Sequence, residues 1–412
     1  MQNIVHFIKN GKFQIGMILC FLLPPVGILL LFLFGLGAIY EGWKDRKSFS
    51  FSFVSMVFFL LLVSTVCASF QMENASLLIG SLMVLGYWGL YLFVRKNGTR
   101  MDFHTFKWII IFGGIYNCIV GWTIHWITIN PLVGFLTGTT QLGEADNSRL
   151  FGSSYNSNFT MYLLLVAIAF MLAEINAVIR KKTVRPLYWQ IPLLLILIFG
   201  VFSTGSRAGY ISMIIVFMLF FLRLNKIVFM SVSTMFIVLF KKIYELMPRN
   251  DNVLYSTYGR ENIWSNSIEL WKQHFLFGTT PLGFRSEYFK LFNDDMVHAH
   301  NLFIGFFAEY GIVGGIALLI LLFSTTYKFI ILLFLKNRNK GLFNYFLFSL
   351  PIIVLTGILD EPTFSPQIAL LTVILLSYWK LYTSQYSVAF LNVKLKKFKK
   401  MPSGVPFHKK FY

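Results

Sequence analysis

The feature that most constrains the fold is a succession of apolar runs, most of them close to the length that crosses a lipid bilayer. A membrane-spanning helix needs about 20 mainly apolar residues, and this chain contains about twelve such runs. Their approximate bounds are 13–23, 26–40, 50–69, 75–94, 108–128, 159–179, 187–203, 207–222, 227–243, 300–335, 342–359 and 367–384. The sequence therefore predicts an all-α polytopic membrane protein in a lipid bilayer.

The distribution of charge supports a membrane protein and excludes a nucleic-acid partner. Only 13% of the residues are charged, whereas a soluble domain has about a quarter. The formal net charge of +19 arises from Lys and Arg in short clusters between apolar runs, as in cytoplasmic loops. Cys20, Cys67 and Cys118 lie inside apolar runs without Cys-x-x-Cys spacing, so we interpret them as small buried hydrophobic residues.

The positive-inside rule orients the chain. Pro24-Pro25 interrupts the first apolar stretch, which forms either two spans or a re-entrant hairpin. If residues 13–40 cross twice, both termini are cytoplasmic and nearly every short basic loop lies inside; Lys241-Lys242 is the exception. The long polar loop 244–299 then lies outside.

This topology divides the chain into four parts. They are residues 1–243, with about nine membrane helices; 244–299, an extracytoplasmic loop carrying active-site residues; 300–384, the C-terminal membrane helices; and 385–412, a basic cytoplasmic tail.

Three arginines on the predicted outer side are candidate anion ligands. Arg207 opens a helix after Ser203-Thr-Gly-Ser206, and helix N-terminal amides together with an Arg form an anion site. The alternative for Arg207 is an interfacial side chain that reaches the head groups. Arg260 and Trp264 are one helical turn apart, and Arg285 follows a Gly-Phe turn. Either arginine could instead be a solvated loop residue.

The histidines and acidic residues that follow are candidates for acid–base chemistry. His300 lies between a polar loop and an apolar helix, where it is either a cap or a functional group. His298 lies two residues earlier, a spacing that suits a strand, and no Cys or third His completes a zinc set, so we predict no metal. Glu309 is ionisable within an apolar stretch and is therefore a functional candidate, with a structural hydrogen bond as the alternative. Asp360-Glu361 in a short outer loop could hold an Arg or a cation.

The combination of motifs is more specific than its parts. His300-Asn301 is followed after nine residues by Gly311 and after two more by Gly314. Gly-Arg-x-x-x-Trp occupies 259–264, Pro-x-Gly-Phe occupies 281–284 and Ser-Arg-Ala-Gly occupies 206–209. This set resembles the signature of the bacterial O-antigen ligase and O-antigen polymerase superfamily.

The resemblance implies a glycosyltransferase with a GT-C-like helical membrane fold. The donor would be an oligosaccharide on undecaprenyl diphosphate and the acceptor a sugar hydroxyl, with no nucleotide, metal or other cofactor. Matched by motif, Arg207 and Arg260 would bind the diphosphate, and Arg285 fits the pattern less closely. His300 would serve near the acceptor hydroxyl, as a base or as an orienting group. We expect Asn301, Glu309, Trp264 and His298 to support the site.

We therefore predict a polysaccharide polymerase on the outer face of the bacterial cytoplasmic membrane. It would join lipid-linked repeat units of an O-antigen, capsule or other cell-wall polysaccharide by inverting transfer, with a chain-length regulator as a further partner. The nearest alternative is an O-antigen ligase that transfers the glycan to a lipid-core acceptor. A lipid-linked glycan transporter is a third alternative, but the sequence lacks evident inverted repeats and its polar residues converge on one outer loop.

Overall fold

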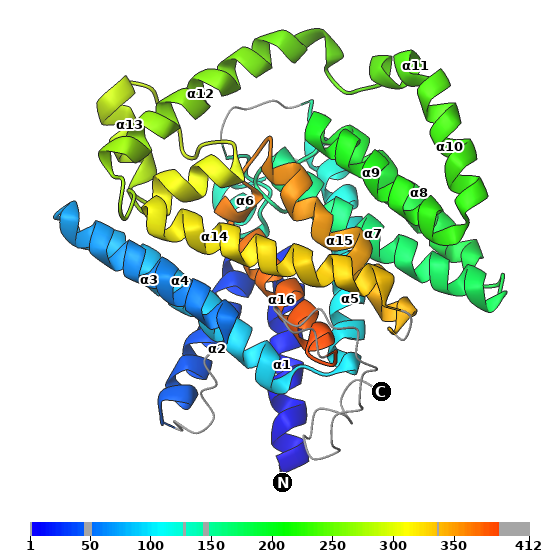
Figure 1. Cartoon of the computed structure of the whole chain (residues 1–412), viewed down its shortest axis with the longest axis horizontal. Coiled ribbons are helices and arrows are strands. Elements are labelled where there is room, and N and C mark those ends of the chain that lie inside the picture. Colours follow the sequence, from blue (N-terminus) through cyan, green and yellow to red (C-terminus); the bar gives the residue numbers. More distant parts are fainter. Residues whose placement is uncertain (1, 45–51, 127–128, 143–147, 336–337, 387–412) are drawn as a thin grey trace.

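The computed structural model describes residues 2–44, 52–126, 129–142, 148–335 and 338–386, and this part of the chain is helical without strands (Figure 1). The all-α prediction is thereby confirmed. The helices are α1 (Gln2–Leu22), α2 (Pro24–Lys44), α3 (Phe53–Gln71), α4 (Leu78–Asn97), α5 (Arg100–Thr123), α6 (Pro131–Thr137), α7 (Ser157–Lys181), α8 (Leu187–Ser203), α9 (Arg207–Leu224), α10 (Lys226–Val238), α11 (Phe240–Glu245), α12 (Val253–Gln273), α13 (Phe284–Phe292), α14 (Leu302–Phe334), α15 (Lys340–Gly357) and α16 (Pro366–Thr383). Short 3-10 turns include η4 (Asn250–Asn252) and η5 (Pro362–Phe364).

The predicted membrane spans are confirmed in part. Among the described residues, eight helices are long and apolar enough to cross a membrane. Of the remaining four expected spans, three correspond to shorter apolar helices and the fourth to α16. The shorter apolar helices are Gly11–Leu22, Leu187–Ser203 and Lys226–Val238. The count of about twelve therefore stays a prediction, whereas the multi-pass character is evident.

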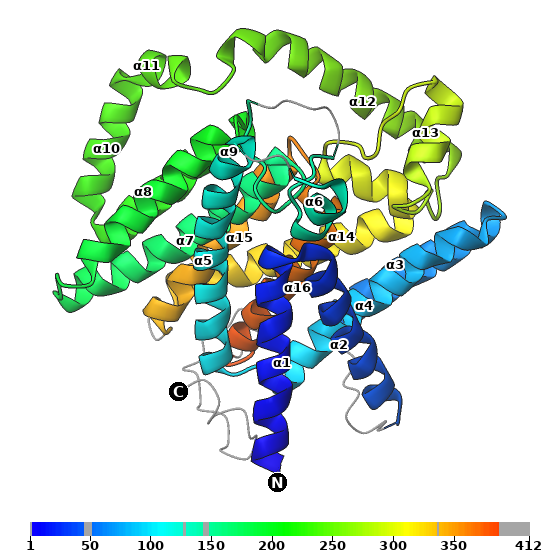
Figure 2. The ribbon, with the colours of Figure 1, turned by 180° about the vertical axis from the view of Figure 1, so that it is seen from behind.

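Helix α7 forms the centre of the bundle. It is buried along most of its length and packs against α5, α8, α9 and α15 (Figure 2). Asn156 caps its N-terminus by accepting a hydrogen bond from the Asn158 amide at 2.8 Å, which satisfies one of the donors that a helix start leaves free. The N-terminal end of α7 thereby has a fixed position beneath the polar end of the molecule.

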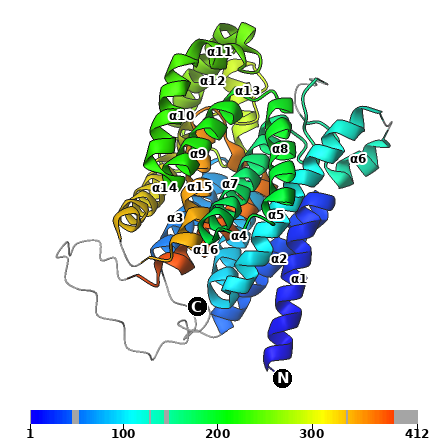
Figure 3. The same cartoon turned by 90° about the vertical axis from the view of Figure 1, so that its right-hand side faces the viewer.

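The residues expected to form a polar loop at 244–299 are largely helical. Helices α11, α12 and α13 lie at the end of the bundle opposite the N-terminus (Figures 1 and 3). The sequence between Asp294 and Asn301 is irregular, so the strand that the spacing of His298 and His300 suggested is wrong. His300 instead has a positive φ of 51°, a left-handed conformation that breaks the alternation of a strand.

Helix α14 is interrupted at Gly311. Its φ of 62° and ψ of −165° are accessible to glycine and strained for other residues. The interruption brings the backbone of 275–280 alongside: Ile312 N donates to Phe275 O at 2.8 Å, and Thr280 N donates to Glu309 O at 2.7 Å. Helix α14 is thus bonded to the segment that connects α12 with α13.

Candidate functional site

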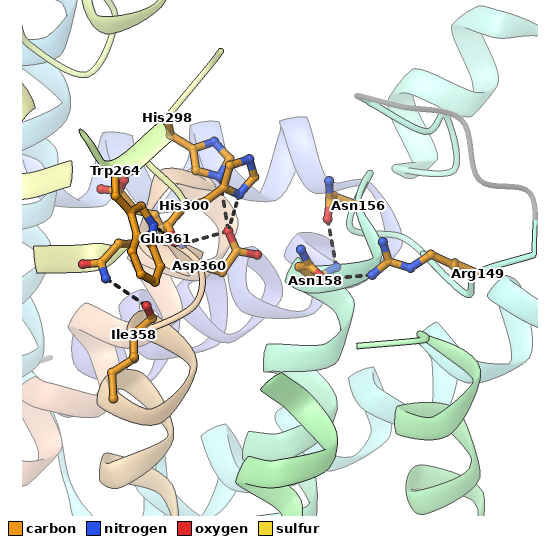
Figure 4. A network of polar contacts seen from close by, with 10 residues as sticks. Arg149, Asn156, Asn158, Trp264, His298, His300, Ile358, Asp360 and Glu361 are labelled. Carbon is orange, nitrogen blue, oxygen red and sulfur yellow. Dashed lines mark hydrogen bonds and ion pairs between the residues drawn. The ribbon is translucent and has the colours of Figure 1, made fainter. Parts of the chain in front are cut away.

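Two histidines share one carboxylate at the polar end of the bundle. His298 Nε2 lies 3.2 Å and His300 Nδ1 lies 3.1 Å from Asp360 Oδ1, which also accepts a hydrogen bond from the Glu361 amide at 2.9 Å (Figure 4). Asp360 is 4% exposed. His298 and His300, which the sequence analysis considered together, are therefore joined by Asp360, which lies just before η5.

Asn301 fixes where His300 lies. As the N-cap of α14, its side-chain oxygen accepts from Phe303 N at 2.9 Å and from Ile304 N at 3.1 Å, and its Nδ2 donates to Ile358 O at 2.9 Å. Trp264 Nε1 donates to the carbonyl of His300 at 3.3 Å. The start of α14, the end of α15 and helix α12 thereby hold the His300 backbone in place.

The protonation of this cluster follows from its hydrogen bonds. Burial favours the neutral acid, but the hydrogen bonds from His298 and His300 hold the pKa of Asp360 well below its usual value. Burial lowers the pKa of His298, which favours its neutral form. Because an ionised carboxylate only accepts, the hydrogen bond between His300 and Asp360 is donated by His300 Nδ1, and Nε2 points away from this carboxylate oxygen. The His300 side chain is 28% exposed, so a substrate can reach it.

A group of arginines lies beside the histidines. Arg207 begins α9 after the N-cap Ser206 and donates a hydrogen bond to Ser256 of α12. Arg249 donates from Nε to Gly205 O at 3.1 Å. Arg249 and Arg260 both interact electrostatically with Arg207. Within the described part of the chain, no carboxylate hydrogen-bonds or ion-pairs with these three guanidinium groups.

Arg260 connects the arginines to the histidines. Burial lowers its pKa, while the nearby carboxylate of Asp360 raises it and Arg249 lowers it further. Arg260 is therefore an electrostatic neighbour of both groups. The structure brings Arg207, Arg260 and His300 into one region, as the sequence predicted, and adds Arg249 and Asp360.

Arg149 is a further arginine that sequence reasoning missed. Its Nε donates to Thr204 O at 2.8 Å. Its Nη2 donates to Asn158 Oδ1 at 2.8 Å (Figure 4). Its side chain also lies next to Gly205, whose positive φ of 64° forms the turn before α9. No sequence motif identified this residue. Arg149 braces the turn from which Arg207 projects.

Residues 192–319 match a family model described as O-Antigen ligase. The match confirms the resemblance to the O-antigen ligase and polymerase superfamily. Among curated proteins, none matches the chain significantly.

The matched segment, residues 192–319, contains Arg207, Arg249, Arg260 and His300, and ends before Asp360. The carboxylate that orients His300 thus comes from outside the matched segment, on the far side of α15. This explains why the motifs alone did not identify Asp360 as a partner for the histidines.

Arg285 also lies within the matched segment, but its side chain pairs with a residue outside the arginine group. On α13 it forms two hydrogen bonds of 2.5 Å with Asp295, and the two side chains are 60% and 54% exposed. No contact in the described residues joins it to Arg207 or Arg260. Its predicted contact with the diphosphate stays a prediction.

Two further carboxyl groups lie deeper than the histidines. Glu309 is 2% exposed and Glu361 is 1% exposed. A Cβ on Gly305 would lie 2.1 Å from Glu361 Oε2, so only glycine leaves room for this side chain. Burial, followed by the charges of Glu309 and Asp360, raises the pKa of Glu361 well above its usual value. The shift favours the protonated form of this carboxyl group, which can donate a hydrogen bond.

The histidine cluster also has the composition of a metal site. The ligand atoms of His298, His300 and Asp360 lie within 4.8 Å of one another. The sequence offered no third ligand, and the fold supplies one in Asp360. The same atoms also satisfy the hydrogen bonds described above, so the arrangement needs no ion to account for its geometry.

Proposed function

We propose that the chain transfers a glycan from a polyprenyl diphosphate to an acceptor hydroxyl at the outer face of the cytoplasmic membrane, in the manner of an O-antigen ligase. The observation that carries the proposal is the position of Arg260. It interacts with Asp360, which holds His300, and with Arg249, which belongs to the arginine group. A proton acceptor and an anion site therefore meet in one place.

The arginine group suits the leaving group of such a reaction. Cleavage of the sugar–phosphate bond places new negative charge on the lipid diphosphate, which must be stabilised as the bond breaks. Guanidinium groups remain charged and bind phosphate bidentately. No carboxylate among the described residues hydrogen-bonds or ion-pairs with Arg207, Arg249 or Arg260, so their mutual repulsion falls when a diphosphate binds.

His300 suits the acceptor half of the reaction. The acceptor oxygen attacks the anomeric carbon, its proton passes to His300 Nε2, and the electron pair of the broken C–O bond leaves with the polyprenyl diphosphate. Asp360 holds the imidazole through Nδ1 and stabilises the imidazolium that forms. A single displacement of this kind inverts the anomeric centre. This geometry favours a base over a purely orienting role for His300.

The family description favours the ligase over the polymerase that the sequence analysis preferred. The site residues described above serve either reaction, because both use the same donor and differ in the acceptor. We therefore propose the ligase. The chain-length regulator and the cytoplasmic position of both termini remain parts of the sequence-based prediction.

The test uses the purified chain in lipid nanodiscs with a lipid-diphosphate-linked repeat unit. Transfer that appears only after a glycolipid acceptor is added supports the ligase, whereas a ladder of products without acceptor supports the polymerase. Unaltered donor under both conditions contradicts an enzyme and favours the transporter. A parallel reaction with EDTA should retain full activity; loss that zinc restores would assign a metal to His298, His300 and Asp360.

A further inference from the structure

Three arginines meet at the end of the bundle opposite the histidine cluster. Arg180 lies in the last turn of α7, Arg223 in the last turn of α9, and Arg338 between α14 and α15. Arg180 Nη2 donates to the backbone oxygen of Arg223 at 2.7 Å, and each of the three guanidinium groups interacts electrostatically with the other two. These three residues are the inner arginine cluster.

The fold holds the cluster in place with uncharged partners. Arg223 Nε donates to Asn344 Oδ1 at 3.0 Å. Arg338 Nη1 donates to the backbone oxygen of Leu335 at 2.8 Å, and its guanidinium carbon lies 4.8 Å from the centre of the Phe343 ring. Because these partners carry no charge, they keep like charges close together without neutralising them.

No carboxylate neutralises the cluster either. The segments that carry it contain Lys and Arg but no Asp or Glu; they are residues 177–186, 222–227 and 333–345. The tail, residues 387–412, likewise has no acidic residue. Glu174, which precedes the cluster on α7, is already paired with Lys107. Within the part of the chain that the structure describes, none of the three guanidinium groups hydrogen-bonds or ion-pairs with a carboxylate.

Part of the cluster remains open to a ligand. Arg180 is exposed, and Arg223 and Arg338 are half-buried. Arg223 Nη2 and Arg338 Nε are enclosed, so a ligand cannot reach these two atoms. Arg223 Nη1 and Arg338 Nη2 are not enclosed, and they donate no hydrogen bond to any described residue. These two nitrogens and the Arg180 guanidinium are therefore the groups that an anion can contact.

The chemistry of the cluster and its surroundings indicates the anion. Guanidinium groups bind phosphate through paired hydrogen bonds, and a bound phosphate would offset the repulsion among them. The neighbouring surface is apolar: Ile179, Leu222 and Phe334 are 43%, 45% and 81% exposed. In the topology predicted from the basic loops, this end of the bundle is cytoplasmic, where basic pockets between membrane helices attract anionic head groups.

We propose that the inner arginine cluster binds a phosphate group, and that the apolar side chains beside it favour the phosphate of an anionic phospholipid over the free ion. The head group would bridge α7, α9 and the connector between α14 and α15. Since α9 begins at Arg207, a lipid bound at its other end would stabilise a helix that carries part of the proposed donor site. The binding itself does not depend on the proposed function.

The test is a titration of the delipidated full chain in dodecyl maltoside. The probes are phosphatidylglycerol, phosphatidylcholine with the same acyl chains, and inorganic phosphate. Native mass spectrometry counts bound lipid, and thermal unfolding reports stabilisation by each probe. Phosphatidylglycerol should act at a concentration at least about tenfold lower than phosphatidylcholine, whose choline brings a positive charge to the arginines. Inorganic phosphate should act more weakly than phosphatidylglycerol, because it lacks the apolar contacts.

Two variants and a matched control locate the binding. Arg180→Gln changes an exposed side chain, so the fold is retained, and Arg223→Gln removes the central guanidinium of the cluster. Each should weaken binding of phosphatidylglycerol about tenfold, because charge-assisted hydrogen bonds to phosphate are lost. Arg185→Gln removes an exposed charge from the connector that follows α7 and should change binding less than about twofold.

Equal binding of the two phospholipids, or binding that neither Arg180→Gln nor Arg223→Gln weakens, would overturn the proposal. Stabilisation by inorganic phosphate at the same concentration as phosphatidylglycerol would support the phosphate site but overturn its assignment to a lipid. The titration contains no donor and measures no turnover. A chain that transfers glycan but fails this test keeps its proposed function, whereas a chain that binds the lipid but transfers nothing keeps the inner site alone.

Discussion

The two ends of helices α7 and α15 carry polar groups of opposite kinds. At one end, Lys107 of α5 contacts Glu174 of α7, and Tyr345 of α15 donates a hydrogen bond to the same carboxylate. At the other end, where α7 begins and α15 ends, the arginine group faces the shared carboxylate of Asp360. The same scaffold thus holds one matched and one unmatched set of charges.

The difference separates structural charge from functional charge. A buried ion needs a partner, and Lys107, 1% exposed, has one in Glu174. Nearby, Asn344 receives a hydrogen bond from Arg223 at 3.0 Å and donates one to Asn176 at 3.0 Å. The Lys107–Glu174 pair has little capacity left for a ligand, because Tyr345 also donates to the same carboxylate. The arginine group keeps that capacity because its partners are a serine hydroxyl and a backbone carbonyl.

The largest expected effect is on turnover after loss of His300. His300→Ala removes the proton acceptor and should lower kcat by about 10²- to 10⁴-fold, while the affinity for the donor changes little. The measurement is initial transfer rate and, separately, donor binding. His274→Ala serves as the matched control, because His274 pairs with Glu287, away from the cluster. Normal turnover in His300→Ala would show that His300 is not the proton acceptor.

The next largest effect is on stability at the matched end. Lys107→Met leaves Glu174 with an unpaired buried charge and should lower the free energy of unfolding by about 3–5 kcal/mol. The double change with Glu174→Leu should restore most of that loss. Thermal unfolding of the nanodisc-embedded protein measures both. If folded Lys107→Met protein is inactive, the matched end also takes part in function.

A smaller effect is expected on donor affinity. Arg260→Gln should weaken donor binding by about 10- to 100-fold, because charge-assisted hydrogen bonds to phosphate are lost. Arg285→Gln should change it less than about threefold, since Arg285 pairs with Asp295 on the surface. Direct donor titration compares the two variants. Equal losses would instead support the diphosphate contact that the sequence predicted for Arg285.

The smallest expected effect is a pH-dependent contribution of Asp360 to the stability of the fold. Its lowered pKa means that the ionised carboxylate stabilises the fold above the unfolded pKa of about 3.9 and that this stabilisation is lost as pH falls through the folded value. Asp360→Asn should therefore reduce stability by about 1–3 kcal/mol at neutral pH. The difference from wild type should narrow below about pH 4. A difference that stays constant below that pH would show that hydrogen bonding, independent of charge, accounts for the role of Asp360.

The sequence predicted the frame of the molecule better than the contacts of its site. The apolar runs gave the helical class and the approximate positions of the long helices, and the motifs placed Arg207, Arg260 and His300 in one region. Asp360 was noted only as a residue that could hold an arginine or a cation. Its distance of 60 residues from His300 hides their contact, because periodicity reports local structure and not which helix ends meet. Arg149 and Arg249 donate hydrogen bonds to the backbone carbonyls of Thr204 and Gly205. Any residue type provides such a carbonyl, so these contacts produce no recognisable sequence motif.

The interruption at Gly311 has a consequence for anyone who exchanges parts between such proteins. The carbonyls of Ala308 and Glu309 accept hydrogen bonds from Thr279 and Thr280, and a Cβ at Gly311 would lie 2.3 Å from Leu276 O. The connector between α12 and α13 therefore packs against the first turns of α14 through specific backbone contacts, and the two segments form one structural unit. A chimera that takes the connector from one protein and α14 from another breaks this unit, so a working graft must carry residues 275–314 together.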